Sequence, residues 1–366
     1  MALHEALVRA ALDDAGVPPD TVDVLLTVAP RSDPYLVHAV AVAERLGLSP
    51  AHCHSYEAGG AGPVLMLRAA HDLLRAGAGR SAVVVAADLP LTGVSREAYV
   101  RNLAQVGPVH PEFEVPFGPT VPAMFALVAR AYLDAYRLDD EALAAVARHD
   151  RAMAAGHPNA HQRGPMSLPA YRDSRMIAEP LRLLDCAPVS DGGGAVVLVA
   201  DQPAADRRWP AVHLAGSGAG TTGLHLSFAS SLTEFAAGVA LEGALQAAGR
   251  RRADIDLALI YDCFSIAMLV NLEDMGFAAR GHGAGVLQDR AAGAAGRLPV
   301  NTHGGLLSHG HPARAGGMSN LVEAVIQLRH AAGDRQVEGC ATALVHGMAG
   351  VFASHAAALL VREEAA

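Results

Sequence analysis

The sequence predicts a duplicated α/β protein in which buried strands alternate with helices. Short apolar runs recur between segments whose apolar residues follow a helical period. The runs are apolar at consecutive positions, which is typical of parallel strands covered on both faces. Residues 64–87 and 318–347 also share one order of features: a helix with an apolar face, a glycine stop, an arginine turn and a buried strand. These observations predict two halves built on one plan.

The first half should start with a helix that ends at Gly16, because glycine readily takes the left-handed conformation that closes helices. Glycines 59 and 60 should mark the turn from a short strand into a helix. Periodicity then gives the elements in order: helix 4–15, strand 22–28, helix 34–46, strand 52–56, helix 64–76 and strand 81–87.

A long excursion over residues 91–188 interrupts the first half. It holds two clear helical patterns, at 121–135 and 139–155, joined by polar, proline-rich connections. The first sheet should resume with a strand at 195–200. The second half then reads as strand 212–215, helix 232–248, strand 257–261, helix 266–275, helix 318–332, strand 341–346 and strand 351–360.

Composition excludes several classes of protein. The 366 residues suffice for two lobes, and the net charge of −9 comes with no dense basic run, which argues against nucleic-acid binding. No apolar run reaches the ~18–20 residues that a membrane helix needs. The amphipathic, partly acidic start fits neither a signal peptide nor a transit peptide, so we expect a cytoplasmic protein.

Two residue types restrict the chemistry further. All 28 basic residues are arginine, so an enzyme that forms a Schiff base through lysine is excluded. The four cysteines are widely spaced, which predicts reduced thiols and no disulfide framework. His52–His54 and His309–His311 invite a metal interpretation. Alternate residues of a strand face opposite sides, however, and no carboxylate has ligand spacing, so we expect no metal site.

Four groups of motifs point to a family. EVPFGPTVPAMFALVARAYLDAY begins a nearly continuous match over residues 114–199, and YDCFS follows at 261–265. NTHGGLLSHGHP lies at 301–312, and LRHAAGDRQVEGCATALVHGMAG at 328–350. Together they resemble the sterol-carrier (lipid-transfer) branch of the thiolase superfamily. The resemblance implies two βαβαβαββ halves in a five-layer α/β/α/β/α body. The first would cover residues 1–205, with a loop domain at 91–188, and the second residues 206–366.

This sequence departs from the family pattern in three ways. Gly60 stands where the family has its cysteine nucleophile, with Gly62 and Pro63 in place of the serine and glycine that follow. Cys53 lies seven residues earlier, inside a strand, and cannot replace it. Tyr261 stands in place of the histidine of an HDCF motif. The family's opening strand is also expected to be absent, which would leave a sheet edge uncovered.

The glycine turn and Tyr261 each have two interpretations. The amides of Gly60 and Gly62 would bind an oxyanion at a helix N-terminus, or the glycines would only form a tight turn. Tyr261 would exchange a proton with the substrate, or it would simply end a buried strand. Tyrosine at this position resembles the steroid side-chain aldolases, which are thiolase-fold lyases without the nucleophile.

The remaining candidates come from the resemblance. It implies an acid/base role for Cys263, although free cysteines are commonly inert packed groups. It implies that His311 binds a thioester carbonyl or shares a proton, and that His346 takes part in catalysis. Gly347 replaces an asparagine that donates to the oxyanion. Asn301 would bind substrate or support its loop.

The leading hypothesis is a homodimeric enzyme that makes or breaks a carbon–carbon bond by aldol or retro-aldol chemistry. Its substrate would be a thioester of coenzyme A or a carrier protein, with no other cofactor and no cysteine acyl-enzyme. The resemblance also implies a possible small companion with an OB-fold and a zinc ribbon. Two alternatives remain: a Claisen-type acyltransferase with another nucleophile, and a non-catalytic lipid-transfer or scaffold subunit.

Overall fold

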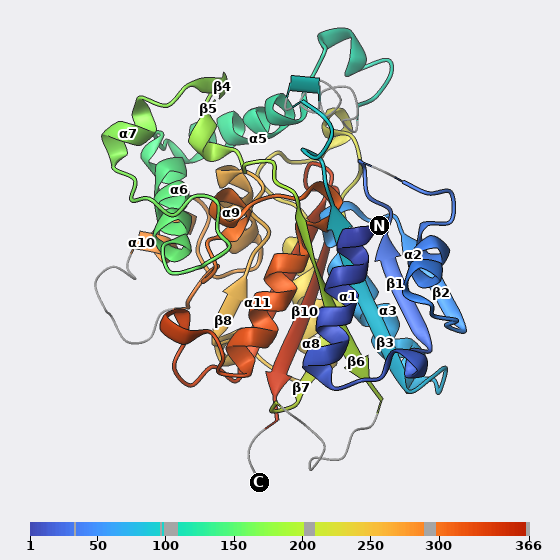
Figure 1. Ribbon diagram of the computed structural model, residues 1–366. Helices are drawn as coiled ribbons and strands as arrows, with labels where there is room; N and C mark the ends of the chain where they lie inside the picture. Colours follow the sequence, from blue (N-terminus) through green and yellow to red (C-terminus); the bar gives the residue numbers. More distant parts are fainter. Residues whose placement is uncertain (33, 96, 99–108, 201–208, 289–297, 364–366) are drawn as a thin grey trace.

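Two mixed sheets form the body of the protein. The computed structural model describes residues 1–32, 34–95, 97–98, 109–200, 209–288 and 298–363. The strand order is β2-β1-β3-β6 in the first half and β7-β10-β9-β8 in the second, and a separate hairpin pairs β4 with β5. Figure 1 shows helices between the two sheets and on their outer faces. The predicted duplicated α/β fold is confirmed.

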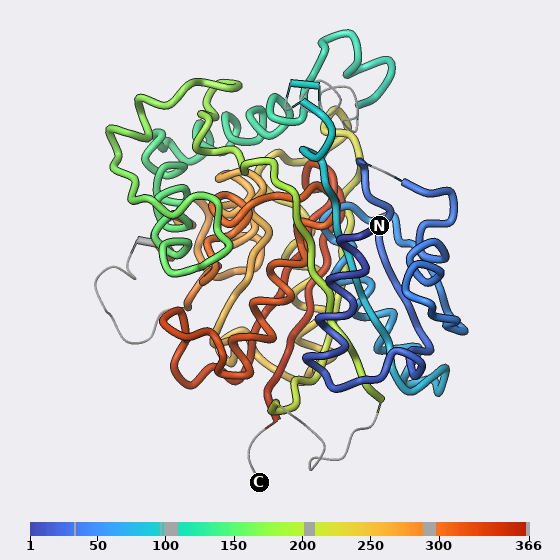
Figure 2. The backbone as a smooth tube through the Cα atoms, in the orientation of Figure 1, coloured from blue at the N-terminus to red at the C-terminus, as the bar shows by residue number. Residues whose placement is uncertain are grey.

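The elements of the first half follow the predicted order. Its sheet and the helices that pack on it are α1 (Ala2–Ala15), β1 (Val24–Val28), α2 (His38–Leu46), β2 (His52–Tyr56), α3 (Gly62–Arg75), β3 (Ser81–Asp88) and β6 (Gly192–Val199). Between β3 and β6 lie α5 (Val121–Tyr136), α6 (Glu141–Ala154), α7 (Leu168–Arg172), β4 (Met176–Ala178) and β5 (Leu181–Arg182). Figure 2 shows this inserted segment lying over one end of the second half.

The second half repeats the arrangement. It contains β7 (Val212–Thr221), α8 (Ala237–Ala248), β8 (Leu257–Leu259), α9 (Ser265–Asp274), α10 (Gly283–Gln288), α11 (Met318–Leu328), β9 (Thr342–Ala349) and β10 (Ser354–Arg362). In each sheet the antiparallel strand, β6 or β10, pairs with the strand before it, β3 or β9. The predicted boundary between residues 205 and 206 lies outside the described residues.

The strands are apolar on both sides because each sheet is covered on both faces. In β1, Val24 and Leu26 face the core between the two sheets, whereas Leu25 faces the outer layer formed by α1 and α2. Helices α3 and α11 lie in the central layer and contact both sheets, and α8 covers β7 and β10 from outside. Burial of both faces explains why the sequence shows continuous apolar runs there.

Glycine-rich strands are longer than the sequence predicted. Strand β7 continues to Thr221 instead of ending at residue 215, because Gly216 and Gly218 press against α8. A Cβ on either glycine would overlap the backbone oxygens of Ala244 and Ala240. Glycine is unfavourable in strands by propensity, so close packing overrides the local preference here. Strand β6 likewise begins at Gly192 and not at residue 195.

No helix in the described ranges is long and apolar enough to cross a membrane.

Candidate active site

Asn301 anchors the end of β8, directly before the candidate residues. Its Nδ2 donates to the carbonyl oxygen of Ile260 at 3.0 Å, and its Oδ1 accepts from the Ile260 amide at 2.8 Å. The residue has a φ of 46°, a left-handed conformation that asparagine tolerates better than most residues. Asn301 is fully buried. Its side chain is therefore committed to loop support, the second of the two roles considered for it.

The backbone of Tyr261 is held on both sides. Its amide donates to Nδ1 of His346 at 3.3 Å, and its carbonyl oxygen accepts from Nδ2 of Asn271 at 3.2 Å. The phenol hydroxyl lies 3.0 Å from Nε2 of His311. Tyr261 is only 4% exposed. Residues that are 50 positions apart in the sequence thus form one hydrogen-bonded pair, as their assignment to one site required.

His346 lies behind Tyr261 in a chain of neutral imidazoles. His355 donates from Nε2 to the carbonyl oxygen of Phe352, at 3.2 Å. Its Nδ1 therefore accepts from Nε2 of His346, at 3.1 Å, which leaves Nδ1 of His346 to accept from the Tyr261 amide. Burial lowers the pKa of both rings, that of His355 to about 4. With both nitrogens occupied, His346 holds Tyr261 in place, which differs from the direct catalytic role expected from sequence.

His311 follows a single π-helical turn, Gly305–His309, and is fixed through its backbone. Its amide donates to the carbonyl oxygen of Pro188 at 3.0 Å, and its own carbonyl oxygen accepts from the Ser190 amide. Burial lowers the pKa of His311 to about 4, so the ring is neutral at pH 7. A neutral imidazole can either accept a proton from Tyr261 or donate one to it.

The ring of Tyr261 fills the space in front of Gly60. A Cβ at position 60 would overlap Cε2, Cζ and the hydroxyl oxygen of Tyr261. Only Gly59 in this turn has a positive φ, of 46°, so Gly60 is required for space and not for backbone conformation. A side chain at position 60 and the Tyr261 ring would thus compete for the same volume. The glycine in place of a nucleophile and the tyrosine at 261 therefore depend on each other.

Gly62 and Gly347 serve close packing in the same region. The Gly62 amide donates to the carbonyl oxygen of Gly59 and is used inside the turn. A Cβ on Gly347 would lie 2.7 Å from the Gly60 carbonyl oxygen and 2.8 Å from Cα of Ala61. Gly347 therefore lets β9 approach the start of α3. The Gly62 amide is therefore not free to bind an oxyanion, and Gly347 has no side-chain amide that could donate to one.

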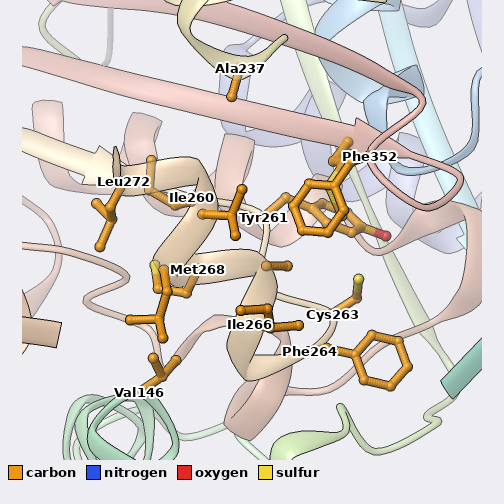
Figure 3. Close-up of a cluster of buried hydrophobic side chains, with 14 of the residues drawn as sticks. Val146, Ala237, Ile260, Tyr261, Cys263, Phe264, Ile266, Met268, Leu272 and Phe352 are labelled. Carbon is orange, nitrogen blue, oxygen red and sulfur yellow. The ribbon is translucent and has the colours of Figure 1, made fainter. Parts of the chain in front are cut away.

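Cys263 is buried near Tyr261. Figure 3 shows its sulfur and the hydroxyl oxygen of Tyr261 on the same edge of the apolar cluster. Its carbonyl oxygen accepts from the Ala187 amide at 3.1 Å. Burial, reinforced by the negative charge of Asp262, raises the pKa of the Cys263 thiol well above its usual range. A protonated thiol can deliver a proton but is a poor nucleophile.

A carboxyl pair beneath the site was not predicted from sequence. Asp262 accepts from the amides of Leu306 and Leu307, at 2.8 and 3.2 Å, and so holds the π-helical turn. Asp150 of α6 lies beside it, and both are fully buried. Burial raises the pKa of Asp262 to about 6, and burial with the neighbouring Asp262 charge raises that of Asp150 well above its usual value. The pair therefore shares a proton near neutral pH.

Within the described residues, no group of three or more His, Cys, Asp or Glu side chains is arranged to hold a metal ion. Cys53 is on β2, and burial raises the pKa of its thiol.

Comparison with known proteins places these features in context. Residues 218–362 match the family model "Thiolase C-terminal domain-like". The chain is 31% identical to an acetyl-CoA acetyltransferase of Methanothermobacter thermautotrophicus over 93% of this chain and 88% of the relative. It is also 31% identical to the 17-hydroxy-3-oxo-4-pregnene-20-carboxyl-CoA lyase of Mycobacterium tuberculosis, over 87% of this chain and 84% of that relative.

A solved structure gives a similar result. The structure titled "Ltp2-ChsH2(DUF35) aldolase" superposes with a TM-score of 0.84 at 29% identity, and the match covers 98% of this chain and 93% of that chain. The relatives thus include proteins named for acyl transfer and proteins named for carbon–carbon cleavage.

Proposed function

The chain belongs to the thiolase superfamily, in its sterol-carrier branch, and on that basis we propose that it is a carbon–carbon lyase of the aldol type. Its substrate is an acyl thioester. One observation carries the choice between cleavage and acyl transfer: the Tyr261 ring fills the space of a nucleophile at position 60, and its hydroxyl bonds to His311. The site therefore offers an acid/base pair where a covalent thiolase has a cysteine.

In the retro-aldol direction the substrate is a β-hydroxyacyl thioester. Its hydroxyl proton passes to the Tyr261 oxygen as the phenol proton moves to Nε2 of His311. The Cα–Cβ bond breaks, its electron pair forms the thioester enolate, and Cβ becomes a carbonyl carbon. Cys263 gives its proton to Cα of the enolate and regains one from His311 through solvent. The net change is one broken bond and one proton moved from oxygen to carbon.

We propose that the start of α3 stabilises the enolate oxygen of the bound substrate. Helix N-termini attract negative charge through their amides and dipole, and the site lies in a poorly solvated region where such interactions are strong. We assign this role to the backbone around Gly60. The rest of the site positions these groups: Asn301 and His346 fix Tyr261, and Asp262 fixes the turn before His311.

Replacement of Cys263 tests the proton-donor role. Cys263→Ser should slow turnover by about tenfold or more, because a hydroxyl is a weaker acid than a thiol. Denaturing mass spectrometry of wild-type protein incubated with labelled acyl-CoA should show no acyl adduct. A stable adduct would favour a Claisen-type acyltransferase, and unchanged turnover in the variant would leave Cys263 a packed thiol.

We also propose how the site is assembled. Strand β2 is a sheet edge whose side chains are exposed or half-buried, and we place the homodimer contact there. The solved aldolase with a DUF35 companion supports a complex with a small second protein. We further propose coenzyme A as the thioester carrier and the cytoplasm as the location. Light scattering of the purified chain, alone and with the companion, tests the assembly; an active monomer would contradict it.

A further inference from the structure

A short segment of the first half, residues 185–190, lies against two candidate residues of the second half. The Ala187 amide donates to the carbonyl oxygen of Cys263 at 3.1 Å. Farther along, the carbonyl oxygen of Pro188 accepts from the His311 amide at 3.0 Å. Cys263 and His311 belong to separate loops, and both are hydrogen-bonded to this one connecting segment. Its position therefore affects where each of them lies.

Asp185 fixes the start of the connecting segment. Its Oδ2 accepts from the Tyr171 hydroxyl and from the Arg182 amide, each at 2.7 Å. Its Oδ1 accepts from the Ser265 hydroxyl, also at 2.7 Å. Tyr171 and Arg182 belong to the inserted segment between β3 and β6, whereas Ser265 is the first residue of α9. One carboxylate thus joins the inserted segment to the second half.

The bond between Asp185 and Ser265 is buried. Both side chains are fully inaccessible to solvent, as is that of Tyr171. A hydrogen bond in such surroundings is not weakened by competing water, and a buried polar group that loses its partner is costly. The bond therefore holds the start of α9 in one position relative to the connecting segment.

The start of α9 is also the support of Cys263, which lies two residues before Ser265. The Phe264 ring, between them, stacks on Phe125 of α5 with the ring centroids 4.3 Å apart. The Ala187 bond holds the Cys263 carbonyl from the same side. A proton donor works only within reach of the atom that it protonates, and a small displacement lowers the rate. Contacts with the inserted segment are well placed to set the position of the thiol.

We propose that Asp185 and Ser265 are positioning residues for Cys263. Through the hydrogen bond between them, the inserted segment of the first half fixes where the Cys263 thiol lies relative to the substrate and to His311. This inference rests on the proposed function, in which Cys263 gives its proton to the enolate. It adds the residues that aim that proton, and it gives the inserted segment a part in the chemistry of the second half.

A matched pair of variants tests the proposal. Ser265→Ala and Tyr171→Phe each remove one buried hydroxyl that donates to Asp185 at 2.7 Å, so both should lower the denaturation midpoint to a similar extent. Only Ser265→Ala should lower kcat, by about tenfold, with KM nearly unchanged. In Tyr171→Phe the Arg182 amide still holds Oδ2 and the Ser265 bond remains, so kcat should stay near that of the wild type. Equal kcat in the two variants would overturn the proposal.

A double variant separates positioning from a general loss of structure. In a Cys263→Ala background, Ser265→Ala should have almost no further effect on kcat, because the thiol that it aims is gone. The same loss of about tenfold in both backgrounds would show that Ser265 acts on some other group, and would refute the role assigned to it.

Asp185→Asn disturbs the same contact more gently and serves if Ser265→Ala does not fold. Two donors face Oδ2, so the amide oxygen stays there and the NH₂ group faces Ser265, whose hydroxyl must then accept. The kcat should fall about threefold, and only while Cys263 is present. Unchanged kcat would count against the proposal. If Cys263→Ala were itself as active as the wild type, the proton-donor role in the proposed function would be refuted, so the two failures are distinguishable.

Discussion

The two halves of the chain share a fold but divide the work differently. The second half supplies the side chains of the candidate reaction, Tyr261, Cys263 and His311, and its sheet is closed on both sides of β10. The first half supplies the glycine turn at Gly60, and among the described residues β6 is the last strand of its sheet. In a duplicated protein, a residue of one half can thus occupy the space that a reactive side chain of the other half would need.

The largest effect should come from the phenol hydroxyl. Tyr261→Phe keeps the ring that packs on Gly60 but removes the proton that it shares with His311, so turnover should fall by about 10²–10⁴-fold. Steady-state kinetics measures the loss, and circular dichroism controls for folding. Full turnover in this variant would show that another residue carries the chemistry, whereas no turnover in the wild type either would indicate a non-catalytic binding protein.

His311 should have the next largest effect. His311→Ala should lower turnover about a hundredfold or more, the scale of losing one preorganised hydrogen-bonding partner. The double variant with Tyr261→Phe should be scarcely worse than the poorer single variant, because the two residues act as a unit. Independent, multiplying effects would show that the hydrogen bond between them carries no catalytic function.

A substitution in the first half tests the shared volume. Gly60→Ala should destabilise the protein by about 1–3 kcal/mol, since its methyl group overlaps the Tyr261 ring. The same change in a Tyr261→Ala background should cost much less. Chemical denaturation measures both, and Gly164→Ala, at a position with open space, is the matched control. An equal cost in both backgrounds would show that a side chain at position 60 does not compete with Tyr261 for space.

The effect of the carboxyl pair should be visible through its dependence on pH. Because the folded protein raises the pKa of Asp262 to about 6 and that of Asp150 well above its usual value, ionisation of the pair opposes folding. Its contribution to stability is therefore lost as pH rises from about 4 through 6 and above. Asp150→Asn removes one charge and keeps an N–H donor for Asp262.

The gain in stability of Asp150→Asn over wild type should thus grow from pH 4 to pH 8 and reach on the order of 1–3 kcal/mol. Urea denaturation across this range measures it, with the exposed Asp20→Asn as control. The difference between variants is informative because the buried histidines, whose pKa values are lowered, affect both proteins alike. A gain independent of pH would mean that the pair is not protonated.

Sequence patterns predicted the elements better than their ends. Helices and apolar strands were placed because their periodicity and burial agree, as in β1 and β3. The glycine-rich β6 and β7 were predicted too short, because their extended conformation comes from contact with β3 and α8 and not from local preference. Helix α10 and the hairpin of β4 and β5 lacked any periodic signal.

The candidate site was predictable only where motifs existed. Tyr261 and His311 were chosen from separate motifs, and the structure brings them together. The supporting role of His346 depends on His355, which no motif marked. The pairing of Asp150 with Asp262 joins residues of different segments, and only the apolar surroundings of Asp150 on α6 gave a hint of its burial. The clash between Gly60 and Tyr261 required coordinates.

That clash also bears on the history of the protein. A side chain at position 60 overlaps the Tyr261 ring as it lies here, so a tyrosine at 261 is accommodated best when the glycine appears first or together with it. The reverse change meets the same conflict, because a cysteine that returned to position 60 would force the Tyr261 ring to move. Steric conflict between these two segments thus couples the residues that positions 60 and 261 can carry.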